Sequence, residues 1–222
     1  MYGRWLPAGE AGPRRKEPLI WTDVASLNWG SDRQRDAYQA LIELDIFSVL
    51  AEFDPALTGT YPLGLETETS DLDVVCHVED FDRFIALVEA AYGYFDDFHI
   101  VRREKNGLPT VICRFQFRTF PVEIFAQPRP SEEQNAYRHM MAEAALLRAG
   151  GEEARAAIRQ LKRDGVKTEP AFGQYFCLEG DPYVALLAVA DMSAAEVADV
   201  VLQARYLRRD AGRQPEAVGE GR

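Results

Sequence analysis

The stretch LTGTYPLGLETETSDLDVVC, residues 57–76, joins two predicted strands. Residues 56–58 predict a short strand that ends at Gly59-Thr60. After ten intervening residues, 61–70, alternating apolar and polar side chains predict a second strand that opens at Asp71-Leu72-Asp73. Because side chains two positions apart on a strand point the same way, we expect Asp71 and Asp73 to share one face.

Outward from this stretch, the pattern is α/β up to about residue 128 and helical afterwards. Asn106-Gly107 separates two alternating runs and predicts a hairpin, and residues 120–126 predict the next strand of an antiparallel patch. Cap signals that predict helix starts are Ser31, Ser131 with Gln134, Asp181-Pro182, and Ser193 with Glu196. We therefore expect a core over residues 18–128, a helical portion packed on it over 129–209, and flexible tails at 1–17 and 210–222.

Composition limits the classes of function. With 25 basic and 36 acidic residues the formal net charge is −11, which disfavours duplex DNA as a partner. Three cysteines without CxxC spacing predict reduced thiols and do not support a zinc site. The sequence shows neither an apolar signal core nor a membrane-length apolar run, so we expect a cytoplasmic protein with no membrane contact.

The residue types around residues 57–76 suit phosphoryl or nucleotidyl transfer. Glycine allows backbone N–H groups to approach a phosphate, and a neighbouring hydroxyl adds a hydrogen bond. Paired carboxylates hold divalent cations that neutralise phosphate oxygens, and Asp71 and Asp73 are placed to do so. A third carboxylate, Glu123, stands in the apolar run VEIF and is expected on a neighbouring strand.

Gly59-Thr60, Asp71-x-Asp73 and Glu123 resemble the signature of the nucleotidyltransferase superfamily typified by DNA polymerase β. More of the chain, roughly residues 35–190, looks like an uncharacterised bacterial branch known as a domain of unknown function, which is distantly similar to the GrpB-like proteins. The motifs that carry this second resemblance are TGTYPLGLETETSDLDVVC, FPVEIFAQ, EEQNAYRHM and DGVKTEPAFGQYF. The resemblance implies an α/β (α+β) fold with a mixed sheet and flanking helices.

The resemblance also implies roles for individual residues. Asp71, Asp73 and Glu123 would bind Mg²⁺ or Mn²⁺, and Glu123 would accept the proton of the attacking hydroxyl. A second group would bind the nucleotide. In it, Gly59 and Thr60 would hold the β- and γ-phosphates, and Gly64 and Ser70 are further candidate contacts. Arg114 and Arg118 are added from spacing alone, because they lie on the polar face of the strand before Glu123, where one of them would steady the triphosphate or the leaving pyrophosphate. Thr60 departs from the usual serine and adds a methyl group beside the phosphate.

Structural interpretations stand beside these roles. Asp71 and Asp73 fit the solvated face of a half-exposed strand, and Glu123 fits an ion pair with Arg114 or Arg118 across adjacent strands. Gly64, in Pro62-Leu63-Gly64, fits a turn as well as a loop near the nucleotide.

The resulting expectation is a metal-dependent nucleotidyltransferase that moves a nucleoside monophosphate from an NTP, such as ATP, to a hydroxyl group. A cationic small molecule, a protein hydroxyl or an RNA end is the expected acceptor, because the chain is acidic. The alternative is an inactive nucleotidyltransferase-like binding or regulatory module, of the kind found in toxin and antitoxin pairs. The sequence does not give the oligomeric state.

Overall fold

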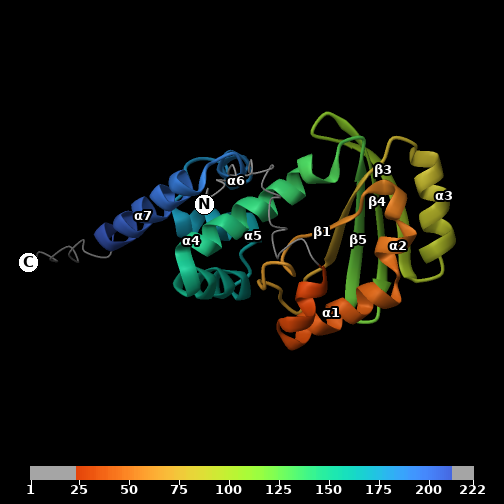
Figure 1. Cartoon of the computed structure of the whole chain (residues 1–222), viewed down its shortest axis with the longest axis horizontal. Coiled ribbons are helices and arrows are strands. Elements are labelled where there is room, and N and C mark those ends of the chain that lie inside the picture. Colours follow the sequence, from red (N-terminus) through yellow and green to blue (C-terminus); the bar gives the residue numbers. More distant parts are fainter. Residues whose placement is uncertain (1–23, 212–222) are drawn as a thin grey trace, which may run out of the picture.

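The computed structural model describes residues 24–211, which form an α/β sheet unit followed by a helical lobe (Figure 1). This confirms the predicted fold class: a five-stranded mixed sheet with flanking helices and a helical C-terminal portion. The predicted tails, 1–17 and 210–222, lie outside the described residues apart from 210–211, which continue the last helix.

The sheet has the strand order β1-β2-β5-β4-β3. Its strands are β1 (Ala56–Thr58), β2 (Leu72–His77), β3 (Asp96–Lys105), β4 (Leu108–Phe117) and β5 (Phe120–Gln127). β2 and β5 pair in parallel, whereas the other neighbouring pairs are antiparallel. The parallel pair brings the two predicted acid-bearing segments side by side.

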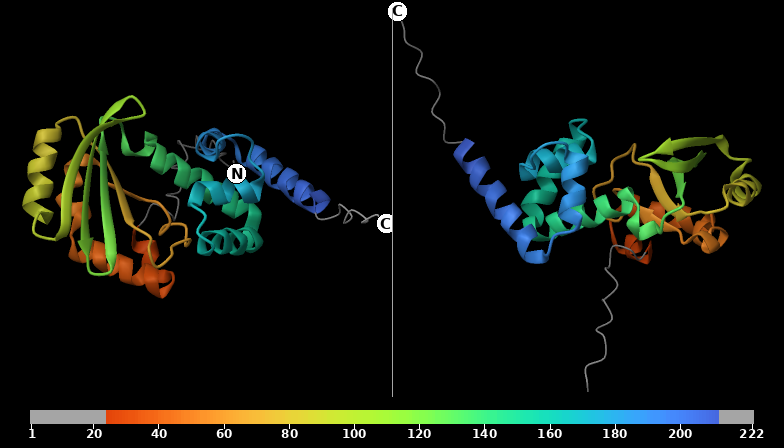
Figure 2. Two further views of the ribbon diagram at one scale, coloured as in Figure 1. Left: turned by 180° about the vertical axis from the view of Figure 1, so that it is seen from behind. Right: turned by 90° about the horizontal axis from the view of Figure 1, so that it is seen from above.

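Helices cover the sheet and build the lobe (Figure 1). In the sheet unit these are η2 (Val24–Trp29), α1 (Asp32–Glu43), α2 (Ile46–Val49), η3 (Ala51–Phe53) and α3 (Phe81–Tyr92). After the sheet come η4 (Ser131–Glu133), α4 (Asn135–Arg163), α5 (Thr168–Phe176), α6 (Pro182–Ala190) and α7 (Ala194–Ala211). The views in Figure 2 show α7 on the side of the lobe away from the sheet.

Two hydrophobic cores stabilise the described residues. The first lies between the sheet and α1–α3, and the second lies among α4–α7. Leu63 and Leu65, from the loop between β1 and β2, are fully buried in the second core although the loop starts and ends in the sheet. This loop therefore ties the sheet unit to the helical lobe.

Most of the local sequence signals are confirmed. Asn106-Gly107 forms the two-residue turn between β3 and β4, with positive φ angles of 55° and 73°. Ser31 caps α1 in a capping box, and Asp181 caps α6 with Pro182 in its first turn. Ser193 and Glu196 form the predicted capping box before α7.

The capping box predicted at Ser131 and Gln134 is wrong. Ser131 begins a single 3₁₀ turn, and its hydroxyl donates to the carbonyl of Asp54. The Gln134 side chain donates to the Cys76 carbonyl, at 2.8 Å, because this segment packs against the end of β2. Tertiary contacts therefore use both polar side chains, and α4 starts at Asn135.

Two further observations concern the cysteines and membranes. Cys76 and Cys113 are buried in strands as free thiols, and Cys177 is half-buried and also free. Among residues 24–211, none of the helices has both the length and the apolar character needed to cross a membrane.

Candidate functional site

The predicted acids meet where β2 and β5 run side by side. Asp73 of β2 and Glu123 of β5 are directly paired in the parallel ladder, so both side chains project from the same face of the sheet. Asp71 lies just before β2 and is exposed, whereas Asp73 is half-buried. Acids from two separate chain segments thus lie on neighbouring strands, beside the end of β1.

Gly59 packs directly against Asp73. Its φ of 75° lies in the left-handed region, which favours glycine. A Cβ atom at this position would overlap Asp73 Oδ2 and would lie 3.3 Å from Asp73 Cγ. The turn after β1 can therefore approach the carboxylate this closely only with glycine.

The next residue, Thr60, has unused hydrogen-bonding groups. Its carbonyl accepts from the N–H groups of Leu63 and Leu65, at 3.2 and 3.0 Å, which closes a tight turn. Within residues 24–211 its own backbone N–H and its hydroxyl make no hydrogen bond. Both groups are available to a ligand, and Thr60 lines the cavity described below.

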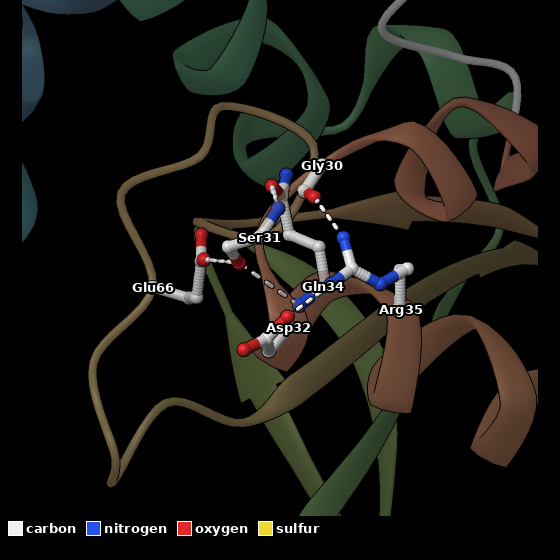
Figure 3. Close-up of polar contacts among 6 residues, drawn as sticks. All are labelled: Gly30, Ser31, Asp32, Gln34, Arg35 and Glu66. Atoms are coloured by element: carbon white, nitrogen blue, oxygen red, sulfur yellow. Dashed lines mark hydrogen bonds and ion pairs between the residues drawn. The ribbon is translucent and has the colours of Figure 1, made fainter.

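The loop over residues 61–70 is held from the α1 side (Figure 3). Ser31, at the start of α1, donates its hydroxyl to Glu66 Oε1 at 2.6 Å, and the Gln34 side chain donates to the Tyr61 carbonyl at 2.7 Å. Arg33 donates to the carbonyls of Glu68 and Thr119, at 3.1 and 3.2 Å. These contacts hold the loop near its start, at Tyr61, and near its end, at Glu66 and Glu68.

The helical lobe holds the same loop from the opposite side. α4 breaks at Gly151, where φ is 71° and ψ is −163°, and two arginines of its second half contact the loop. Arg155 donates to the Leu63 carbonyl, and Arg159 donates to the Gly64 carbonyl at 2.9 Å. These contacts link the position of the loop over residues 61–70 to that of the helical lobe.

A cavity of about 640 Å³ opens between the sheet edge and the helical lobe. This volume lies in the usual range of about 300–1,000 Å³ for small-molecule sites. The chemically important residues that line it are Gly59, Thr60, Ser70, Asp71, Asp73, Lys105, Glu123, His139, Glu143, Lys162 and Glu169. The sheet and the lobe thus each supply one wall.

The carboxylates repel one another in this cavity. Burial, followed by the nearby charges of Glu123 and Asp71, raises the pKa of Asp73 well above its usual range. Burial and Glu123 also raise the pKa of Asp71. Within the described part of the chain, neither aspartate has a hydrogen-bond or ion-pair partner for its carboxylate. A divalent cation would relieve this repulsion, so the donor set fits Mg²⁺ or Mn²⁺.

Glu123 already has a partner. Its carboxylate forms an ion pair with Arg114, the residue paired with it on β4. Among residues 24–211, no three His, Cys, Asp or Glu side chains are already gathered as a metal-binding group. A cation shared by all three acids therefore requires the Glu123 carboxylate to turn away from Arg114 or to be shared with it.

The other predicted nucleotide contacts are divided. Ser70 lines the cavity, and its Oγ accepts from the Thr67 N–H at 2.9 Å. Arg114, Arg118 and Gly64 do not belong to the lining. Arg118 follows β4 instead of continuing its polar face, and it pairs with Glu43 on α1. Gly64 occupies a turn with φ 64°, beside Arg155 and Arg159.

The lobe contributes charged residues that the sequence analysis did not select. Lys162 donates to Thr168 Oγ1 at 2.8 Å, and burial lowers the pKa of its ammonium group although Glu143, Glu169 and Asp73 oppose this shift. Charged residues in amphipathic helices usually face solvent, so helical spacing gave no signal for them. The sequence contains one indication of a buried charge, because Glu143 interrupts the apolar sequence HMMAEAALL.

The family comparison covers most of the chain. Residues 39–189 match the family model described as "Domain of unknown function (DUF4269)". The chain belongs to this family. The DUF4269 match includes the glycine turn, the three acids and most of the helical lobe. Among curated proteins, no sequence matches the chain.

Several solved structures are similar to this DUF4269 chain. The terminal uridylyl transferase Cid1 matches with a TM-score of 0.46 and 11% identity, over 73% of this chain and 50% of Cid1. The GLD-2/RNP-8 complex matches with a TM-score of 0.42 and 12% identity, over 81% of each chain. JHP933 from Helicobacter pylori matches with a TM-score of 0.33 and 14% identity, over 83% of this chain and 100% of JHP933.

These matches do not establish an activity for this chain. This chain spans about half the length of the Cid1 structures. Because the TM-scores lie below 0.5, we base the function proposed below on the site itself. The distant similarity to GrpB-like proteins stays a prediction.

Proposed function

We propose that this chain is a nucleotidyltransferase that uses Mg²⁺ or Mn²⁺ to transfer a nucleoside monophosphate from an NTP to a hydroxyl acceptor. The observation that carries the proposal is the parallel pairing of Asp73 with Glu123, beside a glycine turn that packs on Asp73. This arrangement lines a cavity large enough for a nucleotide.

The triphosphate has donors on both walls of the cavity. Thr60 offers an unused N–H and an unused hydroxyl on the sheet side. Lys162 offers an ammonium group on the lobe side. Backbone N–H groups of glycine turns and lysine ammonium groups are common phosphate ligands. We assign the β- and γ-phosphates to the space between Thr60 and Lys162.

Asp71, Asp73 and Glu123 would hold the metal ions. A divalent cation bound there supplies positive charge to the phosphate oxygens and draws the reacting groups together. The protein's part is to hold the carboxylates close to the glycine turn, which the strand pairing and the anchored loop achieve.

The transfer itself balances without a further reactant. The acceptor oxygen forms a bond to the α-phosphorus while the bond from that phosphorus to the bridging oxygen breaks, and pyrophosphate leaves. The hydroxyl proton passes to a carboxylate of the cluster, which we assign to Glu123. The acceptor is a small molecule, a protein hydroxyl or an RNA end.

Calorimetry with a non-hydrolysable NTP and Mg²⁺ tests the proposal. We expect Asp71→Asn and Asp73→Asn each to reduce NTP·Mg²⁺ affinity by at least about tenfold, or about 1.4 kcal/mol. The control is Asp36→Asn, an exposed aspartate on α1 outside the cavity lining. Unchanged affinity in both cavity variants, with the fold intact, would refute the role.

A second candidate is a nucleotide-binding module without catalysis. The ion pair between Glu123 and Arg114 favours it, because this pair occupies the third carboxylate. A mass-spectrometric screen of four NTPs with both metals separates the two candidates. Pyrophosphate release or a nucleotidylated product supports the enzyme. Nucleotide binding without any product, together with a tight protein partner, supports the module.

A further inference from the structure

We infer that Glu143 and Glu169 form the acceptor subsite of the cavity, and that the acceptor carries its hydroxyl group on a cationic amine. The inference rests on the proposed nucleotidyl transfer and names the class of acceptor. The two glutamates come from α4 and α5, so they belong to the lobe wall that faces the sheet acids.

Glu143 is the central observation. It is 3% exposed, yet within residues 24–211 it makes no hydrogen bond and no ion pair. Its carboxylate oxygens nevertheless keep some accessible surface, and the residue lines the cavity. The carboxylate therefore opens into the cavity and has no partner there from the described part of the chain.

Such a group is costly unless a ligand completes it. An unpaired buried carboxylate loses its hydration without a compensating charge. Burial, then the charge of Glu169, raises the pKa of Glu143 well above its usual range, and the more distant charge of Lys162 offsets this only in part. Stability is commonly sacrificed in this way at binding and catalytic sites.

Lys162 does not fill this role. Its ammonium group is bonded to Thr168 Oγ1, and it forms no ion pair with Glu143 or Glu169 within the described residues. One lysine also faces four acids in its surroundings, since Glu143, Glu169, Asp73 and Glu66 all raise its pKa. Under the proposed function, its charge is further drawn to the triphosphate.

Glu169 extends the acidic wall. It lies in the first turn of α5, its side chain is 25% exposed, and its near partner is His139, with Nδ1 3.7 Å from Oε1. His139 also has its Nε2 2.9 Å from the Tyr183 carbonyl, so the ring is held in place. Glu169 also raises the pKa of Asp73, which shows that the lobe wall and the sheet acids share one electrostatic field.

These charges select among acceptors. An amine bound between Glu143 and Glu169 would donate hydrogen bonds to both carboxylates and would neutralise the wall. A hydroxyl group on the same small molecule would then face the sheet acids across the cavity. An RNA end would instead bring phosphates against two carboxylates, which the field disfavours. The fitting chemistry is an amino sugar or an aminocyclitol.

Calorimetry of the full chain with matched probes tests this inference. The probes are 2-deoxystreptamine, a cyclitol with two amines, and scyllo-inositol, which has hydroxyl groups only. Each is titrated with and without Mg²⁺ and a non-hydrolysable NTP. We expect the diamine to bind at least about tenfold more tightly than inositol. We expect Glu143→Gln and Glu169→Gln each to remove most of this preference.

The control is Glu152→Gln, on the same helix, whose side chain is 87% exposed. It should bind the diamine as the wild type does. Glu143→Gln should also keep or raise the thermal midpoint, because it removes a buried unpaired charge. If this variant does not fold, Glu169→Gln, at a partly exposed position, carries the test.

The outcomes separate this inference from the proposed function. If the NTP binds but the diamine does not, or if both glutamine variants bind the diamine as well as Glu152→Gln does, the acceptor subsite is wrong. If a short RNA binds in preference to the diamine, the inference is also overturned. If the diamine binds in a Glu143-dependent way but no NTP binds, the subsite stands and the proposed nucleotidyl transfer fails.

Discussion

The replacement Gly59→Ala tests the close approach between the glycine turn and Asp73. An alanine at φ 75° pays the usual cost of a left-handed residue, about 1–2 kcal/mol. Its Cβ would also overlap Asp73 Oδ2, and rotating the carboxylate away gives only partial relief because Asp73 Cγ lies 3.3 Å from the same point. An off-rotamer aspartate adds about 0.5–1.5 kcal/mol.

The matched control is Gly180→Ala. Gly180 has almost the same φ, 77°, but a Cβ atom there would meet nothing within 4 Å. In urea unfolding followed by circular dichroism, we expect Gly180→Ala to lose about 1–2 kcal/mol and Gly59→Ala to lose about 1.5–3.5 kcal/mol. The difference isolates the contact with Asp73 from the backbone strain.

Two further measurements complete this test. Gly59→Ala should weaken NTP·Mg²⁺ binding by at least about tenfold, because the displaced carboxylate no longer faces the cavity as before. In the background of Asp73→Ala, the additional loss of stability should disappear, since the overlapping atoms are gone. The reasoning is refuted if Gly59→Ala costs no more than Gly180→Ala and binds the nucleotide like the wild type.

Three other substitutions test separate parts of the account. Lys162→Met should reduce NTP affinity by about 10- to 100-fold in calorimetry, as expected for the loss of a charged hydrogen bond of about 1.5–3 kcal/mol; an unchanged affinity would contradict its role. Arg114→Met should raise Mn²⁺ affinity in a metal titration, because it frees Glu123; weaker Mn²⁺ binding would show that the arginine supports the site. Leu63→Ala should lose about 2–5 kcal/mol of stability, whereas Leu202→Ala, at a 60% exposed position on α7, should stay within about 0.5 kcal/mol; equal losses would contradict the tie between the two cores.

The sequence predicted the sheet side of the site because its signals are local. Alternation along β2 and the Asn106-Gly107 turn each depend on a few neighbouring residues, and the structure confirms both elements. The joint placement of Asp73 and Glu123 is a consequence of strand pairing. The sequence analysis expected Glu123 on a neighbouring strand, and the parallel register of β2 and β5 pairs it directly with Asp73.

The lobe side of the cavity could not be predicted in this way. Glu143 and Lys162 line the same cavity from opposite sides of the break at Gly151 in α4, and the half that carries Lys162 packs on the loop through Arg155 and Arg159. Helical periodicity marks the apolar face of a helix but does not say which charged residues face another part of the chain. Such placement depends on long-range packing.

The misplaced arginine and cap have similar causes. Arg118 continues the alternation of β4 in sequence, but the chain turns after Phe117 and the arginine has a φ of 55°. It then pairs with Glu43, which lies 75 positions away. Ser131 likewise donates to Asp54, 77 positions away, instead of capping α4. Local patterns cannot reveal such partners.

A crystal structure with Mn²⁺ and a non-hydrolysable NTP tests the central claim most directly, because manganese is located by its anomalous scattering. We predict a manganese peak bounded by the carboxylates of Asp71, Asp73 and Glu123, with the triphosphate over Gly59 and Thr60. A manganese peak away from these three carboxylates, or a nucleotide bound outside the cavity, would contradict the account.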